Sequence, residues 1–229
     1  MFKYLIANNF DPYHENKNKN NCFNIALKYN NDKILNYLFE KYKDFTFVNK
    51  NQESFLYLIL QNEKLKYVDV LIKEKNVDIN LGEKEYNITP LIITIVNNLA
   101  KEFNSLINCP KINLTKPDKY GNTCLHYAIL ESNFDFVVKI IDKIENFNYQ
   151  DLNGVTPFHL LIQKNDLFHK LYQENKKIFD KFVKGTNFNL IDNKGVTIAL
   201  ALIKNSIDNI TIEILNKKKI NQFISNLEG

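Results

Sequence analysis

One eight-residue string returns along this chain, and its regular return constrains the fold more than any other feature. Residues 121–128 read Gly-Asn-Thr-Cys-Leu-His-Tyr-Ala and residues 154–161 read Gly-Val-Thr-Pro-Phe-His-Leu-Leu, with weaker copies at 87–94 and 195–202. The threonine of each string marks the spacing, and the four threonines are Thr89, Thr123, Thr156 and Thr197. They stand 34, 33 and 41 residues apart. A period near 33 residues is typical of stacked helical repeats, in which each unit buries its apolar side against its neighbours.

Each unit reads as a turn followed by two helices. In the clearest copy, Gly121 suits a turn because glycine accepts a positive φ, and Thr123 is placed to cap the helix that follows. Apolar residues at helical spacing predict a short helix after Thr123 and a more apolar one after the break at Ser132-Asn133. Two fainter copies upstream carry Asn21 and Ser54 in place of the threonine. The sequence therefore predicts about six units.

The charge pattern argues against a nucleic-acid partner. The chain has 30 basic and 26 acidic residues, a net charge of +4, and every basic residue is a lysine. This is a mixed surface and not a basic footprint. Lysine also lacks the planar fork with which arginine grips phosphate or guanine. Any partner must then be anchored by Tyr, Phe and Leu side chains.

Cysteine usage and hydropathy indicate the compartment. Cys22, Cys109 and Cys124 are odd in number and far apart, which indicates thiols in a reducing compartment and neither a disulfide framework nor a zinc site. No apolar run reaches the roughly 18 residues of a membrane span. We expect no metal, no cofactor, no membrane insertion and a monomer. The expected location is cytoplasmic or otherwise intracellular, with secretion into a host cell left open.

These strings resemble the ankyrin-repeat family. Residues 121–128 and 154–159 carry the resemblance most strongly, and each turn aspartate stands three residues before its glycine, at Asp118, Asp151 and Asp192. The resemblance implies an all-α fold, an α-solenoid of about six stacked helix–turn–helix units with half-units or capping helices at the ends. It covers residues 1–227 and is weaker before residue 60, where it implies looser turns.

The spacing divides the chain into a single array over residues 1–229. The expected units lie near 1–12 (partial), 13–48, 49–83, 84–117, 118–150, 151–191 and 192–229. The partial unit indicates either excision from a longer array or a native cap, and residues 217–227 are expected to form a C-terminal cap. The long step of 41 residues places about eight extra residues between Gln163 and Ile178, where we expect a lengthened helix pair.

The resemblance also implies a surface for a partner protein. Members of the family mostly bind proteins on a concave face, through the residues that follow each turn aspartate and each glycine, and through the ends of the first helices. On this chain those positions are Glu85, Tyr86, Ile88, Lys119, Tyr120, Asn122, Leu130, Glu131, Leu152, Asn153, Val155, Gln163, Lys164, Asn193, Lys194 and Val196. Among them Tyr86, Tyr120 and Leu152 are expected to form an apolar stripe across three turns.

The expected function is a non-catalytic scaffold for a partner protein or peptide. The resemblance implies that His126 and His159 tie neighbouring turns together through both ring nitrogens. Cys124 stands two residues from His126 on one helix and so points elsewhere, which argues against a nucleophile pair. Two alternatives stay open. The chain could be a regulatory or targeting segment of a larger enzyme or of a pathogen effector directed at host proteins, or it could bind a small molecule or modified peptide in an aromatic pocket.

Overall fold

The computed structural model describes residues 11–74, 76–205 and 208–217, and its regular elements in this part are 13 α-helices and one 3-10 helix. Two isolated β-bridges, Val48 with Ser54 and Ile191 with Thr197, close turns between helices. The chain forms two compact units, divided between Lys119 and Tyr120, which are called unit 1 and unit 2 below. The all-α solenoid fold expected from the repeat is confirmed. Among the described helices, none combines the length and apolar character that crossing a membrane requires.

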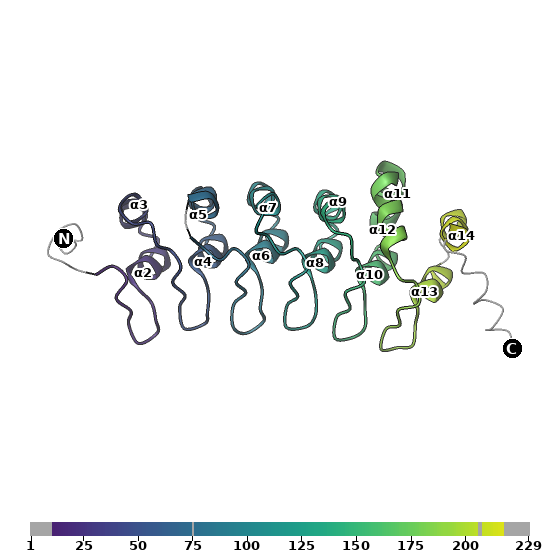
Figure 1. The fold of residues 1–229 in the computed structure, drawn as a ribbon, viewed down its shortest axis with the longest axis horizontal. Coiled ribbons are helices and arrows are strands. Elements are labelled where there is room, and N and C mark those ends of the chain that lie inside the picture. Colours follow the sequence, from purple (N-terminus) through teal and green to yellow (C-terminus); the bar gives the residue numbers. More distant parts are fainter. Residues whose placement is uncertain (1–10, 75, 206–207, 218–229) are drawn as a thin grey trace. The chain divides into compact units, whose positions relative to one another are not determined.

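Unit 1 consists of helix pairs, each with a short first helix and a second helix that packs on it (Figure 1). Its helices are α2 (Cys22–Lys28), α3 (Asp32–Lys41), α4 (Phe55–Gln61), α5 (Val68–Glu74), α6 (Pro90–Val96) and α7 (Ala100–Ile107), with the 3-10 helix η1 (Leu65–Tyr67) before α5. The first helices α2, α4 and α6 pack in sequence, and α5 packs on α7. The turns that precede the first helices project to one side.

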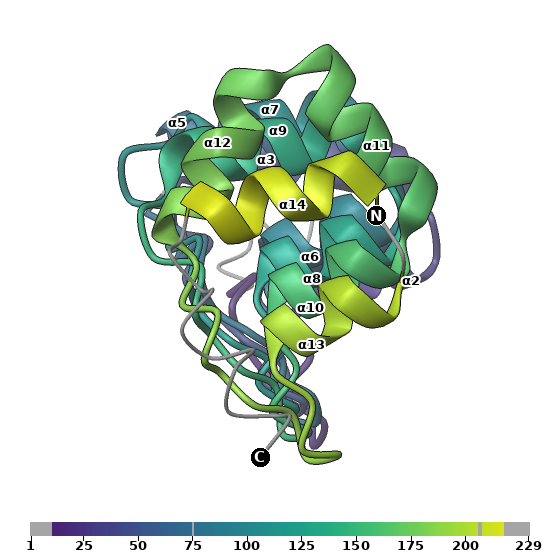
Figure 2. The ribbon, with the colours of Figure 1, turned by 90° about the vertical axis from the view of Figure 1, so that its right-hand side faces the viewer.

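Unit 2 repeats the plan with one addition. Its helices are α8 (Cys124–Leu130), α9 (Phe134–Lys143), α10 (Pro157–Gln163), α11 (Asn165–Glu174), α12 (Lys176–Gly185), α13 (Ile198–Lys204) and α14 (Asp208–Lys217). Figure 2 shows α8, α10 and α13 one behind another, with their turns extending to the same side. Here α10 contacts both α8 and α13.

The first helix of each pair begins directly after the threonine of the repeated string, or the residue that replaces it, because that side chain caps the helix. Thr156 Oγ1 accepts from the backbone N–H of His159 at 3.3 Å, and Thr197 Oγ1 accepts from that of Leu200 at 3.1 Å. Ser54 does the same in a fainter copy, with its hydroxyl 3.1 Å from the N–H of Tyr57. Each cap satisfies an N–H that has no partner inside the helix.

The turns keep one hydrogen-bond pattern whether or not they contain glycine. At the head of one turn, Asp151 Oδ1 accepts from two backbone N–H groups, those of Asn153 and Val155, both at 2.8 Å. Asn49 makes the equivalent bonds with a neutral amide oxygen, to Asn51 at 3.0 Å and Glu53 at 3.1 Å. Before residue 60 the pattern is therefore kept, with somewhat longer bonds.

Where glycine is missing, another residue takes its left-handed conformation. Gly121, Gly154 and Gly195 have positive φ, and Lys19 (φ 55°), Gln52 (φ 57°) and Asn87 (φ 58°) have it in the upstream turns. A non-glycine residue pays a steric cost there. The hydrogen bonds from backbone N–H groups to the Asp or Asn side chain at the start of each turn stabilise the turn against that cost.

Aromatic side chains fill the core of each unit. In unit 1, Phe23, Phe45 and Phe55 are fully buried, with centroids 5.2 Å apart for Phe23–Phe45 and 5.6 Å for Phe45–Phe55. In unit 2, the ring of Phe158 lies 5.0 Å from that of Phe182. Edge-to-face and stacked contacts of this kind stabilise the fold beyond the burial of area alone.

The expected lengthened helix pair at residues 163–178 is wrong, because the extra residues form a third helix. Helix α11 ends before Asn175, whose backbone (φ −141°, ψ 63°) leaves the helical region. Asn175 Oδ1 then accepts from the N–H of Ile178 at 3.3 Å and caps α12. The change of direction between α11 and α12 is visible in Figure 2. An asparagine that reads as one more polar helix position is here an N-cap.

Two expectations fall on other parts of the chain. The partial first unit lies almost wholly in residues 1–10, and the C-terminal cap at 217–227 lies beyond Lys217. Both are outside the described residues.

Candidate protein-binding surface

Neighbouring turns within each unit are joined by backbone hydrogen bonds near their tips. In unit 1 the N–H of Lys84 donates to Asn51 O at 2.8 Å, and that of Lys119 donates to Tyr86 O at 2.7 Å. In unit 2 the N–H of Leu152 donates to Tyr120 O at 2.8 Å. The side chains on these tips therefore stand on a backbone whose register is fixed from turn to turn.

The two histidines make the second connection between turns, as expected. Thr156 N–H donates to His159 Nδ1 at 3.2 Å, so Nε2 carries the ring proton and faces Val196 O of the next turn at 3.3 Å. His126 repeats this geometry, with Nδ1 3.0 Å from Thr123 N and Nε2 3.3 Å from Val155 O. Burial lowers the pKa of His159, which keeps the ring neutral as this bonding requires.

These residues are structural and offer no nucleophile. Burial raises the pKa of the Cys124 thiol to about 12, so it stays protonated near neutral pH. Both ring nitrogens of His126 and of His159 are already engaged with the turns. Among the described residues, no group of three or more His, Cys, Asp or Glu side chains could hold a metal ion.

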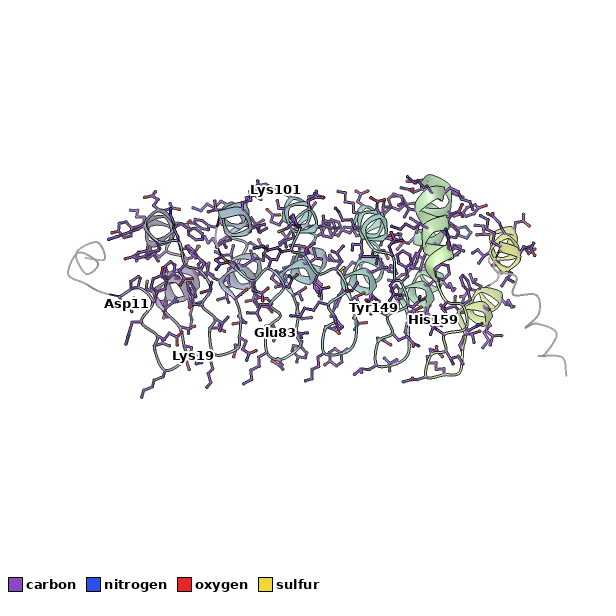
Figure 3. The ribbon with its side chains drawn as sticks, in the orientation of Figure 1. Asp11, Lys19, Glu83, Lys101, Tyr149 and His159 are labelled. Carbon is purple, nitrogen blue, oxygen red and sulfur yellow. The ribbon has the colours of Figure 1, made fainter. Side chains whose placement is uncertain are left out.

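Most of the predicted partner-binding residues are exposed. The exposed ones lie on turn tips or at the ends of first helices, and they are Glu85, Tyr86, Lys119, Tyr120, Leu130, Glu131, Leu152, Asn153, Gln163, Asn193 and Lys194. The other five are half-buried. Four of them follow a glycine or the residue that replaces it, and the fifth is a lysine at the end of a first helix: Ile88, Asn122, Val155, Val196 and Lys164. In Figure 3, Lys19 and Glu83 lie on turns of unit 1, while Lys101 lies on the side away from them.

The structure brings some of these residues together. In unit 1, Glu85, Tyr86 and Lys119 line a hollow of about 520 Å³, and the Lys119 ammonium lies 5.7 Å from the Tyr86 ring centroid. In unit 2, Gln163 and Lys164 line a second hollow of about 470 Å³. Tyr120 and Leu152 belong to adjacent, hydrogen-bonded turns of unit 2. Since Tyr86 belongs to unit 1, its place in the expected stripe stays a prediction.

The hollow of unit 1 contains residues that the sequence reasoning missed. Tyr57, Glu53 and Glu83 line it together with the predicted residues. The repeat spacing held a signal for Tyr57, which stands three residues after Ser54, where other units have histidine. Burial raises the pKa of Tyr57 to about 12, with Glu83 and Glu53 adding to the shift, so its hydroxyl keeps its proton.

Comparison with known proteins supports the resemblance to ankyrin repeats. Residues 56–151 match a family model described as ankyrin repeats in three copies. The chain is 26% identical to ankyrin repeat protein L371 of Acanthamoeba polyphaga mimivirus, over 73% of this chain and 24% of that protein. It is 31% identical to ankyrin repeat protein FPV031 of fowlpox virus, over 59% of this chain and 42% of that protein. The chain thus spans less than half the length of these relatives.

Solved structures share the fold. The ankyrin repeat domain of Bcl-3 superposes with a TM-score of 0.70 at 12% identity, covering 93% of this chain and 90% of that one. An ankyrin repeat domain from Acinetobacter baumannii superposes with a TM-score of 0.63 at 16% identity, covering 83% and 94%. Repeated capped helices, turns tied by histidine, the family match and these superpositions agree: residues 56–151 are ankyrin repeats, and the chain has the fold of solved ankyrin-repeat domains.

Proposed function

We propose that the chain is a non-catalytic module that binds a partner protein or peptide through its turn tips and the ends of its first helices. The supporting observation is the exposure of large apolar side chains on a fixed backbone. Leu152 is 68% exposed and Tyr120 is 46% exposed, and their turns are joined by the bond from Leu152 N to Tyr120 O. Exposed apolar side chains that lie on adjacent turns are typical of interaction sites.

The rigidity of these positions favours binding. Ordering a flexible side chain or loop on association costs free energy, and a preorganised surface avoids part of that cost. Tyrosine adds a large, rigid contact area with one polar end. Leu130, at the end of α8, is 41% exposed and extends the apolar surface of unit 2 from the turns toward the helices.

A second candidate is a regulatory or targeting segment of a larger enzyme or of a pathogen effector directed at host proteins. It is favoured by the lengths of the relatives, since the chain covers 24% and 42% of the two viral proteins and 9% of alpha-latrotoxin-Lg1a of Latrodectus geometricus, at 31% identity. We place the chain inside a cell in either case. The length of the native open reading frame distinguishes this candidate from a free-standing module.

The test is capture of a partner from the source cell with three immobilised forms of the chain. We expect the wild type to retain a partner and the double variant Tyr120→Ala/Leu152→Ala to bind it roughly 30-fold more weakly, as for loss of interface anchors. Ile212→Ala is the matched control, because Ile212 is 58% exposed but lies on α14, away from the turns. Thermal unfolding of all three forms should nearly coincide. Equal capture by the double variant and the wild type would contradict the proposal.

A further inference from the structure

The hollow of unit 1 combines acidic and aromatic side chains. It lies between the turns at 49–54 and 83–89, and its volume is about 520 Å³. Glu53, Glu83 and Glu85 line it together with the rings of Tyr57 and Tyr86. An acidic cluster is by itself often only a solvated surface, so the state of each polar group in the hollow decides what it can do.

Tyr57 contributes a hydroxyl to the hollow, and its hydrogen bonding differs from that of the equivalent histidines. Its side chain is 8% exposed, and among the described residues its hydroxyl has no hydrogen-bond partner. Its position in the repeat is that of His126 and His159, whose rings reach the carbonyl of the next turn. The equivalent carbonyl here, Ile88 O, accepts from Glu83 N–H at 3.2 Å, as Val155 O does from Asp151 N–H at 2.9 Å, and no bond from Tyr57 to it is found among the described residues. Tyr57 Oη is not one of the fully enclosed polar atoms that lack a partner, so it keeps some exposure on the lining of the hollow, where a ligand can donate to it.

The carboxylates differ in how far they are engaged. Glu83 is held by its own turn, accepting from the N–H groups of Glu85, Tyr86 and Ile88. Glu53 accepts from Asn49 Nδ2. These bonds orient the carboxylates but leave their charges in place. Burial is the main cause of the raised pKa of Tyr57, and the charges of Glu83 and Glu53 add to it.

Two lysines also border the hollow, so its three carboxylates outnumber its cations by one. Among the described residues, neither Lys84 nor Lys119 forms an ion pair with the glutamates of the hollow. Lys119 instead places its ammonium 5.7 Å from the centroid of the Tyr86 ring. That contact shows that the ring accepts a cation and that Lys119 already lies over it.

We propose that this hollow receives a basic side chain, lysine or arginine, of the partner, which rests on the proposed function as a protein-binding module. The cationic head donates to the carboxylates of Glu53 and Glu85 and to the oxygen of Tyr57, while its stem packs against Tyr86. Hydrogen bonds from a cation to carboxylates are stronger than neutral ones, and the half-enclosed position weakens competition from water. The chain has no arginine of its own, so an arginine here would come only from the partner.

The experiment titrates the isotope-labelled chain with single capped amino acids and follows backbone amide shifts. The probes are N-acetyl-arginine amide and N-acetyl-lysine amide at millimolar concentration, with the glutamine and glutamate analogues as controls. We expect saturable shifts at residues 51–57 and 83–86 with the basic probes alone. Tyr57→Phe should weaken binding about fivefold, as for loss of one hydrogen bond.

Glu85→Gln supplies a variant that does not depend on the core, because Glu85 is exposed, and it should weaken binding by a similar factor. Glu40→Gln, on the exposed side of α3, is the matched control and should have no effect. Binding of the glutamate probe at the hollow would overturn the inference, because Lys84 and Lys119 would then dominate. Shifts elsewhere, or shifts insensitive to Glu85→Gln, would overturn it too.

The capture experiment separates this inference from the proposed function. Partner capture that is lost in Tyr120→Ala/Leu152→Ala, together with no response to the basic probes, would overturn the hollow and leave the docking surface standing. A response at the hollow, together with capture that the double variant keeps, would support the hollow and overturn the docking surface of unit 2.

Discussion

At the scale of single residues, one position of the repeat shows how far a side chain must reach. His126 and His159 each accept from their own cap residue and extend to the next turn. Asn24 holds the same position and makes the first bond, with Oδ1 3.2 Å from Asn21 N. Its amide nitrogen is buried without a partner among the described residues, because the side chain is too short to reach the next turn.

Asn24→His should therefore stabilise the chain. The imidazole would keep the bond from Asn21 N–H and extend its Nε2–H toward Glu53 O, the counterpart of Val155 O. One added hydrogen bond and one unpaired buried donor removed correspond to about 1–2 kcal/mol. Urea unfolding at pH 8 measures this, with Lys28→His as a control that adds histidine on the exposed side of α2. An unchanged or lower free energy of unfolding would show that the ring does not reach across.

The sequence contains part of this residue-scale detail. Thr156 and Thr197 can be found as caps because hydroxyl residues before an apolar helix have a local physical reason to be there. The left-handed conformations of Lys19 and Gln52 could not be predicted, since nothing in those side chains favours a positive φ. These conformations are imposed by the hydrogen bonds that the side chain at the start of the turn accepts from backbone N–H groups. The repeat spacing marks the position of Tyr57, but it does not show that Glu83 and Glu85 of the next turn line the same hollow.

At the scale of elements, the turns of unit 2 pack closely enough to require glycine at some positions only. A Cβ added to Gly121 would lie 2.8 Å from the Cα of Asp151, and one on Gly154 would lie 2.8 Å from Ile191 O. Gly195 has a similar φ of 75°, but among the described residues no atom lies within 4 Å of its added Cβ. Comparing the three glycines thus separates two costs of substitution: the strain of a side chain at positive φ and the clash of that side chain with the next turn.

Alanine substitution at these glycines should give two classes of effect. Gly195→Ala should cost about 1–2 kcal/mol, the strain of a left-handed residue alone. Gly121→Ala and Gly154→Ala should cost clearly more, because backbone atoms of the next turn must move. Chemical unfolding of the three variants provides the comparison, with Gly195→Ala as the matched control. An equal decrease in the free energy of unfolding for all three variants would mean that the next turn moves away from the added methyl group without a free-energy cost.

The element that the sequence misplaced is also explained by a local bond. The residues between Gln163 and Ile178 carry helical spacing and no breaker, so the sequence predicts a lengthened helix pair. The break depends on Asn175 turning its side chain back to cap α12. Asparagine is abundant in this chain, and most of its copies make no such cap. The sequence alone does not tell which one ends a helix.

At the scale of the whole molecule, a repeat protein is stabilised by contacts between neighbours, so an individual element can be released without the rest. Helix α14 is attached to its neighbours partly by charge. Glu213 accepts from Tyr172 Oη at 2.7 Å and pairs with Lys176 Nζ at 2.8 Å, joining α14 to α11 and α12. Lys217 pairs with Glu213 at 2.8 Å and with Asp180 at 3.1 Å.

Acid should loosen α14 before it affects the centre of unit 2. Hydrogen bonds from Lys176, Lys217 and Tyr172 lower the pKa of Glu213 from 4.5 to about 2. A lowered carboxyl pKa stabilises the folded state fully above pH 4.5, and this contribution is lost as the pH falls through about 2. Since the carboxylate is one-third exposed, salt should weaken the effect.

Amide hydrogen exchange between about pH 6 and pH 2.5, corrected for intrinsic rates, tests this attachment. Protection in α14 should fall relative to α8 as the pH drops. Glu213→Gln should show the lower protection already at the higher pH and little further change, because its side chain cannot titrate. Glu145→Gln is the control, since Glu145 pairs with Lys181 on the surface with 87% of its side chain exposed and should leave the pattern unaltered. If the Glu213→Gln variant protects α14 at the higher pH as well as the wild type does, packing holds the helix and the charges do not, and the acid response must arise elsewhere.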